Sequence, residues 1–242
     1  MTGVQTCALP IWKQNYQKAF ESNIFNKKES NSNKKDKDKD SNLNRSTRVN
    51  KTNNEKEIKE RLDVIWKVMD NCINRGLVTE GYLPGPLNLQ RRAPSLYKKL
   101  LEESTSQNPM FYLNWINAHA IAVSEENASG GQVVTSPTNG SAGVIPAVLN
   151  YYFKFCADKH PNKLHDFLLS AGAIGGIFKL NSTISGAEGG CQAEIGVSAS
   201  MAAAGLTCAL NGNINQIEKA SESAMEHFIG MTCDPIGGLV QI

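Results

Sequence analysis

The feature that most limits the possible fold is a polar tract near the N-terminus that has almost nothing to bury. Between residues 26 and 54 the only aliphatic side chains are Leu43 and Val49, and most other positions hold Asn, Lys, Ser, Asp or Thr. Ordering such a segment costs about 1 to 2 kcal/mol per residue, with little burial to offset it. We therefore expect residues 12–55 to be low-complexity and mostly disordered, and we assign the folded domain to residues 56–242.

The lysines of this tract do not indicate a nucleic-acid site. Asp36, Asp38 and Asp40 alternate with them, and the tract has no aromatic residue to stack on a base. The whole chain has a formal net charge of +2, which favours neither nucleic acid nor membrane as a partner. The apolar start from Cys7 to Trp12 is too short for a secretory signal, so we expect a cytoplasmic location.

Residues 1–11, MTGVQTCALPI, match the conceptual translation of a common sequencing-library adapter. We interpret them as an adapter-derived artefact and leave them out of the reasoning about the fold. This interpretation predicts that Cys7 has no role and that native N-terminal sequence is missing from the chain.

Hydrophobic periodicity begins near Lys56. Apolar side chains then recur every three or four residues at Ile58, Leu62, Ile65, Met69 and Ile73. This spacing predicts an amphipathic helix that ends near Gly76, followed by a turn-rich connection over residues 81–90. Further helices are predicted at residues 95–103, 110–123, 144–157, 162–169, 198–210 and 217–228. Because only residues 132–135 offer a short β-branched run, we predict a mainly α fold, an all-α domain with glycine-rich loops.

Two glycine-rich loops are unusually polar for their apolar surroundings. SEENASGG, residues 124–131, ends one predicted helix, and SPTNGSAG, residues 136–143, opens the next. Asn139-Gly140 is a turn signal and Ser141 is a plausible N-cap. Free N–H groups at a helix start can bind a carboxylate or a phosphate. The loops are therefore either capping turns without a ligand or an anion site.

The polar groups of these loops favour a zwitterionic amino acid as the ligand. Thr138, Asn139 and Ser141 provide hydrogen-bond donors, and Glu125 or Glu126 is a candidate partner for an ammonium group. The density of these groups favours a small-ligand site over capping turns that bind nothing.

The six cysteines are widely spaced in a chain without an export signal, which indicates reduced thiols. Cys72, Cys156 and Cys208 fall within predicted helices, and we interpret them as core residues. Cys191 and Cys233 lie on predicted loops at helix ends, where ligation of a metal by a thiolate is favoured. Their spacing matches no compact zinc or ferredoxin pattern, so it does not assign a metal.

Four long stretches carry a resemblance to a known family. They are RGLVTEGYLPGPLNLQRRA, AVSEENASGGQVVTSPTNGSAGVIPAVLNYY, AGAIGGIFKLNSTISGAEGGCQAEIGVSASMAAAGL and AMEHFIGMTCDPIGGLVQI. From about residue 60 to residue 242 the chain resembles the catalytic domain of bacterial-type iron–sulfur L-serine dehydratases. In that family three cysteines hold a 4Fe–4S cluster with one open iron, and L-serine is converted into pyruvate and ammonia without pyridoxal phosphate. The resemblance implies an L-serine ammonia-lyase.

The same resemblance implies a set of site residues. Cys191 and Cys233 would be two of the three ligands of the 4Fe–4S cluster, and His227 is the candidate catalytic residue. The two polar loops would bind L-serine, and their candidate substrate-binding residues are Ser124, Glu125, Asn127, Ala128, Ser129, Gly130, Thr138, Asn139, Gly140 and Ser141.

Parts of the family pattern are not found in this chain. The third cluster ligand belongs to a PCIERN-like segment that follows VQI, and Ile242 is the last residue of VQI here. A separate α/β domain with a Ser-Ser-Ser-His-Thr motif is also absent, and residues 1–55 occupy its place. We therefore expect a C-terminally truncated serine dehydratase α domain with little or no activity, because the number of ligands sets the affinity for a metal.

Two other functions stay open at this point. The chain is alternatively a non-catalytic helical domain that binds an amino acid or an anion, in which case iron chelation would not affect binding. An electron-transfer iron–sulfur protein is a further alternative, but the polar loops and the missing fourth cysteine argue against it. The sequence permits a homo-oligomer without indicating its size.

Overall fold

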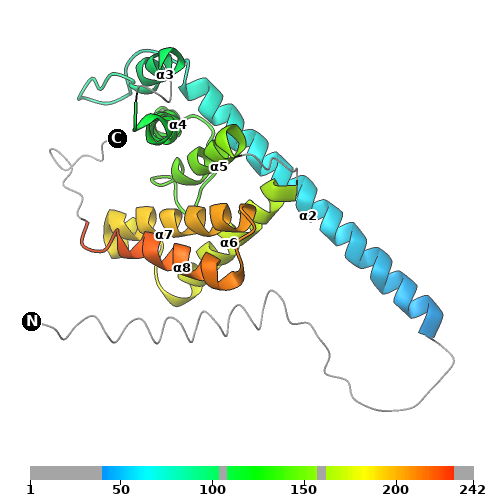
Figure 1. Cartoon of the computed structure of the whole chain (residues 1–242). Helices are drawn as coiled ribbons and strands as arrows, with labels where there is room; N and C mark the ends of the chain where they lie inside the picture. The colour runs from blue at the N-terminus through cyan, green and yellow to red at the C-terminus, as the bar shows by residue number, and fades with distance from the viewer. Residues whose placement is uncertain (1–39, 104–107, 157–161, 232–242) are drawn as a thin grey trace, which may run out of the picture. The chain divides into compact units, whose positions relative to one another are not determined.

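The computed structural model describes residues 40–103, 108–156 and 162–231, with side chains from residue 55 onward. These residues form seven helices (Figure 1): α2 Asp40–Gly76, α3 Ala93–Glu102, α4 Phe111–Ala128, α5 Val144–Phe155, α6 Asn162–Asn181, α7 Gly186–Ala209 and α8 Ile214–Glu226. Within these ranges there is no β-strand, only an isolated bridge between Tyr82 and Gln90. The predicted mainly α fold is confirmed, and residues 132–135 have no regular secondary structure.

Several helices extend well beyond the bounds that the sequence pattern predicts. Helix α2 begins at Asp40, inside the tract expected to be disordered, because extending an existing helix costs far less than starting one. Helix α6 continues to Asn181 and α7 begins at Gly186, each through a glycine-containing stretch. Each glycine lowers the stability of a helix by about 1 kcal/mol, so helix propensity alone does not predict these stretches as helical. Packing of α6 along α7 stabilises these glycine-containing parts of both helices.

The chain divides into two compact units, residues 1–58 and 59–242, and the predicted site residues all lie in the second. Within that unit α7 is the central helix, in contact with α5, α6 and α8. Helix α4 packs between α3 and α5. Among the described residues, no helix combines the length and the apolar content needed to cross a membrane.

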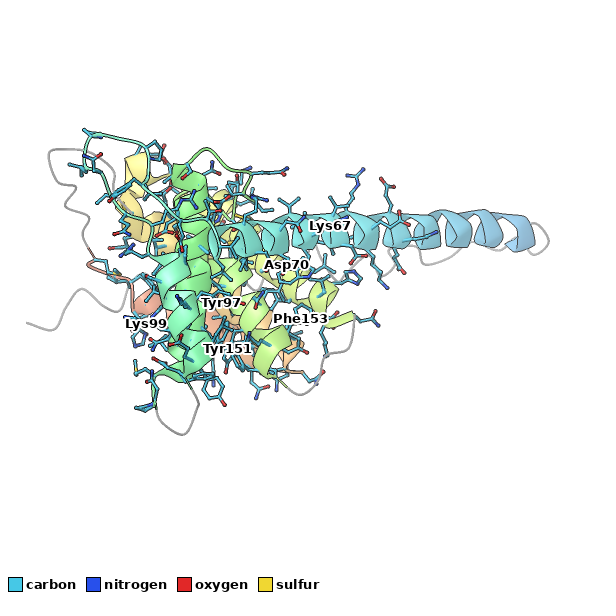
Figure 2. The ribbon with its side chains drawn as sticks, turned by 90° about the horizontal axis from the view of Figure 1, so that it is seen from above. Lys67, Asp70, Tyr97, Lys99, Tyr151 and Phe153 are labelled. Carbon is cyan, nitrogen blue, oxygen red and sulfur yellow. The ribbon has the colours of Figure 1, made fainter. Side chains whose placement is uncertain are left out.

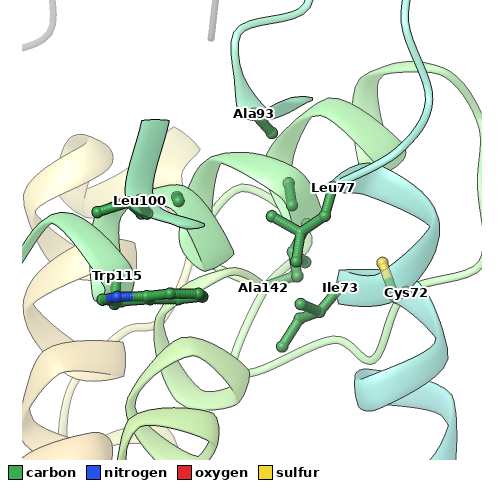
Figure 3. Packing of buried hydrophobic residues seen from close by; sticks show 10 residues of the cluster. Cys72, Ile73, Leu77, Ala93, Leu100, Trp115 and Ala142 are labelled. Carbon is green, nitrogen blue, oxygen red and sulfur yellow. The ribbon is translucent and has the colours of Figure 1, made fainter. Parts of the chain in front are cut away.

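The C-terminal end of α2 packs into an apolar cluster together with α3 and α4 (Figure 3). Its buried members are Cys72, Ile73, Leu77, Ala93, Leu100, Trp115, Ala118, Ala122, Val123 and Ala142. Aromatic rings extend the packing: Tyr97 of α3 meets the Trp115 ring edge-on at 5.7 Å between centroids, and Phe153 of α5 lies 5.5 Å from Trp66. Figure 2 shows Tyr97 and Phe153 on these two helices. The predicted periodic face of α2 is therefore a core face at Met69 and Ile73, whereas Leu62 and Ile65 are half-buried and Ile58 is exposed.

Gly76 ends α2 at its closest approach to α4. A β-carbon placed on Gly76 would lie 2.4 Å from the carbonyl oxygen of Ala122 and 2.8 Å from its Cβ. The obstructing atoms belong to the backbone and to a buried methyl group, so neither can move aside cheaply. Only glycine fits at this crossing.

We expect Gly76→Ala to lower the free energy of unfolding by about 1 to 3 kcal/mol, because it overpacks the crossing of α2 and α4. Gly172→Ala in α6 is the matched control, since its β-carbon would meet nothing within 4 Å. There alanine should stabilise the helix by roughly 0.5 to 1 kcal/mol. Urea unfolding followed by circular dichroism measures both effects, and a Gly76→Ala protein as stable as wild type would contradict the close approach.

His119 of α4 is buried beside Trp115 without a partner for its Nδ1 atom within the described structure. Its side chain is 3% exposed, and its ring lies 5.5 Å from the Trp115 ring. Burial and, to a smaller extent, the positive charge of Lys154 together lower the pKa of His119 to about 4. Lys154 itself lies over the Trp115 ring, with Nζ 3.5 Å from the centroid. The imidazole is therefore neutral at pH 7.

This burial predicts a pH-dependent stability. The pKa of His119 is about 4 in the folded chain against 6.5 ordinarily, so between these values the unfolded chain binds the extra proton. The stability is complete above pH 6.5 and declines towards pH 4, by about 3 kcal/mol in all. Urea midpoints between pH 4 and 7 should show this decline in wild type and lack it in His119→Phe. The same pH dependence in both proteins would show that His119 is not the group responsible.

Candidate functional site

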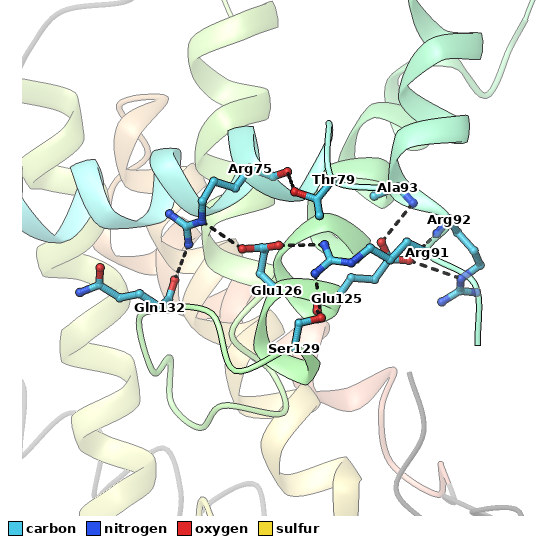
Figure 4. Close-up of polar contacts among 9 residues, drawn as sticks. All are labelled: Arg75, Thr79, Arg91, Arg92, Ala93, Glu125, Glu126, Ser129 and Gln132. Carbon is cyan, nitrogen blue, oxygen red and sulfur yellow. Dashed lines mark hydrogen bonds and ion pairs between the residues drawn. The ribbon is translucent and has the colours of Figure 1, made fainter. Parts of the chain in front are cut away.

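Two consecutive carboxylates at the C-terminal end of α4 organise the first polar loop (Figure 4). Glu126 accepts hydrogen bonds from Arg91 Nη1 at 2.8 Å and from Arg75 Nε at 3.0 Å. Arg75 also donates to the carbonyl oxygen of Gln132 at 3.1 Å, and Arg91 Nη2 donates to Ser129 Oγ at 2.7 Å. The end of α2, the connection before α3 and the loop after α4 are thereby joined at one carboxylate.

Glu126 keeps its negative charge although its side chain is buried. Burial alone would raise the pKa of this carboxyl, but hydrogen bonds from Arg91 and Arg75, together with their positive charges, hold the pKa below its ordinary value. The Arg91 side chain is 7% exposed, whereas that of Arg75 is 44% exposed. Arg91 is therefore the more deeply buried partner, and an ion pair of this kind stabilises only while both members are present.

Glu125 is fully buried and caps α3 from another helix. Its carboxylate accepts hydrogen bonds from the backbone N–H groups of Arg92 at 2.6 Å and Ala93 at 3.3 Å. These groups lie at the N-terminus of α3, where Arg92 itself provides no side-chain cap. A carboxylate at this end of a helix also interacts favourably with the helix dipole. Both predicted ammonium partners thus have partners within the protein, and direct contact of Glu125 with substrate stays a prediction.

The first loop is helical over most of its predicted length. Helix α4 continues to Ala128, so Ser124, Asn127 and Ala128 are half-buried helical positions. Ser129 and Gly130 follow the helix and are exposed, and Gly130 has a positive φ of 74° that favours glycine. Of the polar stretch 124–131, only residues 129–131 therefore form a loop.

The second loop is held by hydrogen bonds from α7. Ser198 Oγ lies 2.8 Å from the carbonyl oxygen of Ser136 and 3.2 Å from that of Ser141, and donates to these acceptors. Ser141 is 1% exposed and its hydroxyl group lies 3.1 Å from Thr138 Oγ1. Helix α5 begins with Gly143 as its N-cap residue, so the predicted capping role of Ser141 is wrong. Its hydroxyl instead donates to the Ser136 carbonyl oxygen at 3.3 Å, which fixes the turn from inside.

The tip of the second loop is exposed. Thr135 Oγ1 donates to Asn139 Oδ1 at 2.6 Å, which steadies the side chain of the turn. Asn139 and Gly140 are exposed, and a β-carbon placed on Gly140 would lie 3.3 Å from Glu194 Oε2 of α7. The predicted turn at Asn139-Gly140 therefore lies against the helix that carries Cys191.

Cys191 lies in α7 directly after a break in the helix. Gly190 has φ 73° and ψ 177°, a conformation that side-chain-bearing residues rarely adopt. Cys191 was predicted on a loop; it instead follows this break and is exposed at the beginning of the uninterrupted part of α7. Cys233, the second predicted ligand, lies outside the described residues. Within those residues, no group of three or more His, Cys, Asp or Glu side chains is arranged to hold a metal ion.

The remaining described cysteines are poor ligands. Burial raises the pKa of the Cys72 thiol to about 11 and also raises the pKa values of Cys156 and Cys208. Near Cys208 the negative charge of Asp166 acts in the same direction. Because metal ligation requires a thiolate, these three thiols disfavour it. Among the described cysteines, Cys191 is the exposed one.

His227 ends α8 and is exposed. Its Nδ1 atom donates a hydrogen bond to the carbonyl oxygen of Ser223 at 2.7 Å, because a carbonyl oxygen can only accept. Three residues later, the backbone N–H of Gly230 donates to Gln192 Oε1 at 2.9 Å. The chain after α8 therefore returns to the residue that follows Cys191.

Sequence reasoning missed Arg75 and Arg91. Their contacts with Glu126 join positions 51 and 35 residues apart. No local periodicity or turn signal reports such a contact, although a buried Glu-Glu pair at a helix end requires partners somewhere in the chain.

The fold and these contacts define an all-α domain that holds two polar loops beside a cysteine-bearing helix. The sequence profile of the serine dehydratase alpha chain matches residues 11–242. The chain is 52% identical over 191 residues to an L-serine dehydratase of Haemophilus influenzae, covering 78% of this chain and 42% of that protein. It is 56% identical over 179 residues to the L-serine dehydratase TdcG of Escherichia coli, covering 74% and 39%.

A third relative, the L-serine dehydratase of Streptomyces coelicolor, is 53% identical over 188 residues, which cover 78% of this chain and 41% of the relative. The chain belongs to the serine dehydratase alpha chain family. It spans about two fifths of the length of the curated relatives that it matches.

We expect Arg91→Met to lower the free energy of unfolding by about 3 kcal/mol, because it removes the buried partner of a buried carboxylate. Arg75→Met is the matched control at the exposed end of the same network, and should cost about 1 kcal/mol or less. Methionine retains most of the side-chain volume in both variants. Urea unfolding at neutral pH compares them, and equal losses would contradict the leading role of Arg91.

Proposed function

We propose that the chain is the catalytic α domain of a lyase that dehydrates and deaminates L-serine to pyruvate and ammonia with a 4Fe–4S cluster. Family membership and the L-serine dehydratase activity for which the relatives are named support the reaction class. The single structural observation that carries the cluster proposal is the hydrogen bond between Gly230 and Gln192, since each lies next to or near a candidate ligand in sequence.

Cys191 and Cys233 would hold the cluster. Gln192 is the neighbour of Cys191, and Gly230 precedes Cys233 by three residues. The 2.9 Å contact brings the chain segment that precedes Cys233 to the neighbour of Cys191, which supports ligation of one cluster by both thiols. When bound, a cluster with an open iron supplies a Lewis acid that polarises the serine hydroxyl as leaving group.

The second polar loop would bind the substrate carboxylate. Gly140 leaves its backbone N–H accessible at the tip of the turn, and α5 starts three residues after Ser141. Backbone N–H groups at such a turn and helix start attract an anion, and Thr138 and Asn139 add side-chain donors. Because Ser198 fixes the loop from α7, the anion site and the cysteine helix would keep a constant separation.

His227 is the proposed acceptor of the α-proton. Its Nδ1–H group donates to the Ser223 carbonyl oxygen, which fixes the tautomer of the neutral ring and leaves Nε2 as the acceptor nitrogen. Removal of the α-proton together with loss of the hydroxyl group gives aminoacrylate, which hydrolyses to pyruvate and ammonia. General-base catalysis of this kind contributes a factor of about 10² to 10⁴ in rate.

Anaerobic reconstitution with iron and sulfide tests this proposal. We expect the wild-type chain to bind iron and sulfide weakly, and Cys191→Ser and Cys233→Ser to abolish this binding. Cys208→Ser is the matched control, a thiol on the same helix as Cys191, and should retain wild-type iron content. Extending the chain by a PCIERN-like segment should raise iron retention and permit pyruvate formation from L-serine.

Iron and sulfide analysis, visible absorption and a pyruvate assay give the readouts. Unchanged iron content in Cys191→Ser would refute ligation by this thiol. Binding of L-serine that is insensitive to iron chelation, without pyruvate in any form of the chain, would instead indicate a non-catalytic amino-acid-binding domain.

A further inference from the structure

Glu194 lies between the tip of the second loop and the start of α7. It lies one helical turn after Cys191 and is half-buried. A β-carbon on Gly140 would lie 3.3 Å from Glu194 Oε2, and one on Gly186 would lie 2.7 Å from the same atom. The carboxylate is thus flanked by two glycine backbones, one from each glycine-rich motif.

The other carboxylates near the loops have partners. Glu126 is paired with Arg75 and Arg91, and Glu125 accepts two backbone N–H groups of α3. Glu188, in the same motif as Glu194, accepts a hydrogen bond from Thr183 Oγ1 at 2.6 Å. By contrast, Glu194 forms no hydrogen bond or ion pair within the described part of the chain.

We propose that Glu194 binds the ammonium group of L-serine and thereby selects a free α-amino acid. This inference rests on the proposed function, and it names the substrate-binding residue for one of the two charges of the substrate. The proposed role of Glu194 is separate from cluster ligation by Cys191 and from proton transfer by His227.

The geometry of the substrate favours this position. The ammonium and carboxylate groups of L-serine are attached to the same carbon atom, so a site for both must place an anionic acceptor beside N–H donors. The Glu194 carboxylate and the Gly140 backbone meet this requirement. A β-carbon on Gly140 would touch Oε2, so the carboxylate lies directly beside the backbone of the loop. A half-buried carboxylate without a cation can also accept a charge-assisted hydrogen bond from a bound ammonium group.

Gly140 and Gly186 leave room for the Glu194 carboxylate because they lack side chains. A side chain at Gly186 would collide with the carboxylate, and one at Gly140 would fill the space between the carboxylate and the loop. With glycine at both positions, the carboxylate can face a small ligand while the loop backbone stays close to it.

Ligand titrations of the metal-free chain test the proposal without turnover. L-serine is compared with 3-hydroxypropionate, which lacks only the ammonium group, by nuclear magnetic resonance titration of the wild type, Glu194→Gln and Glu188→Gln. Glu194→Gln should weaken L-serine binding about 10- to 100-fold and change binding of 3-hydroxypropionate by less than about twofold, because one charge-assisted hydrogen bond is lost. Glu188→Gln should leave both affinities unchanged.

Each other outcome counts against the proposal. Equal loss for both ligands in Glu194→Gln would assign Glu194 a merely structural role, and no loss for either would remove it from the site. Wild-type chain that binds L-serine no better than 3-hydroxypropionate would overturn the inference, while iron content and pyruvate formation would still decide the proposed function independently.

Discussion

The Glu126 carboxylate, held between Arg91 and Arg75, is the interaction on which the rest of the site depends. It costs free energy to bury a charge, and this cost is offset only because two guanidinium groups from distant segments converge on the same side chain. That convergence fixes the end of α2 and the connection before α3 against the end of α4. The neighbouring Glu125 then caps α3, so one dipeptide orients three helices.

Helix α7 has the corresponding role on the other side of the loops. Its Ser198 holds the backbone of the second loop, its Gln192 receives the chain that returns from α8, and Cys191 and Glu194 lie within one turn of each other. A single rigid element therefore determines the spacing of all these groups. Function-bearing side chains on a helix are positioned more accurately than on a loop.

The sequence was sufficient for the helical class of the fold and for the motifs, but not for how the motifs are held. Periodic apolar residues predicted the core face of α2, and its end at Gly76, because those signals are local. The full lengths of α6 and α7 were missed because their glycines lower helix propensity, while packing between the two helices restores it. Arg75 and Arg91 could not be found, since charged residues carry no local sign of a distant partner. Ser141 was predicted as the N-cap of α5, two residues before the observed Gly143, because its burial against Ser198 depends on α7 and leaves no local signal.

The long sequence separation within the Glu126 network has a consequence for biosynthesis. Arg75 contacts residues 126 and 132, both more than fifty positions later. A nascent chain emerging from the ribosome cannot complete these contacts until Gln132 has been translated and released from the exit tunnel. The apolar face at the end of α2 is only partly covered during that period, since Ala142 of its cluster emerges later still, and a chaperone can bind the exposed part.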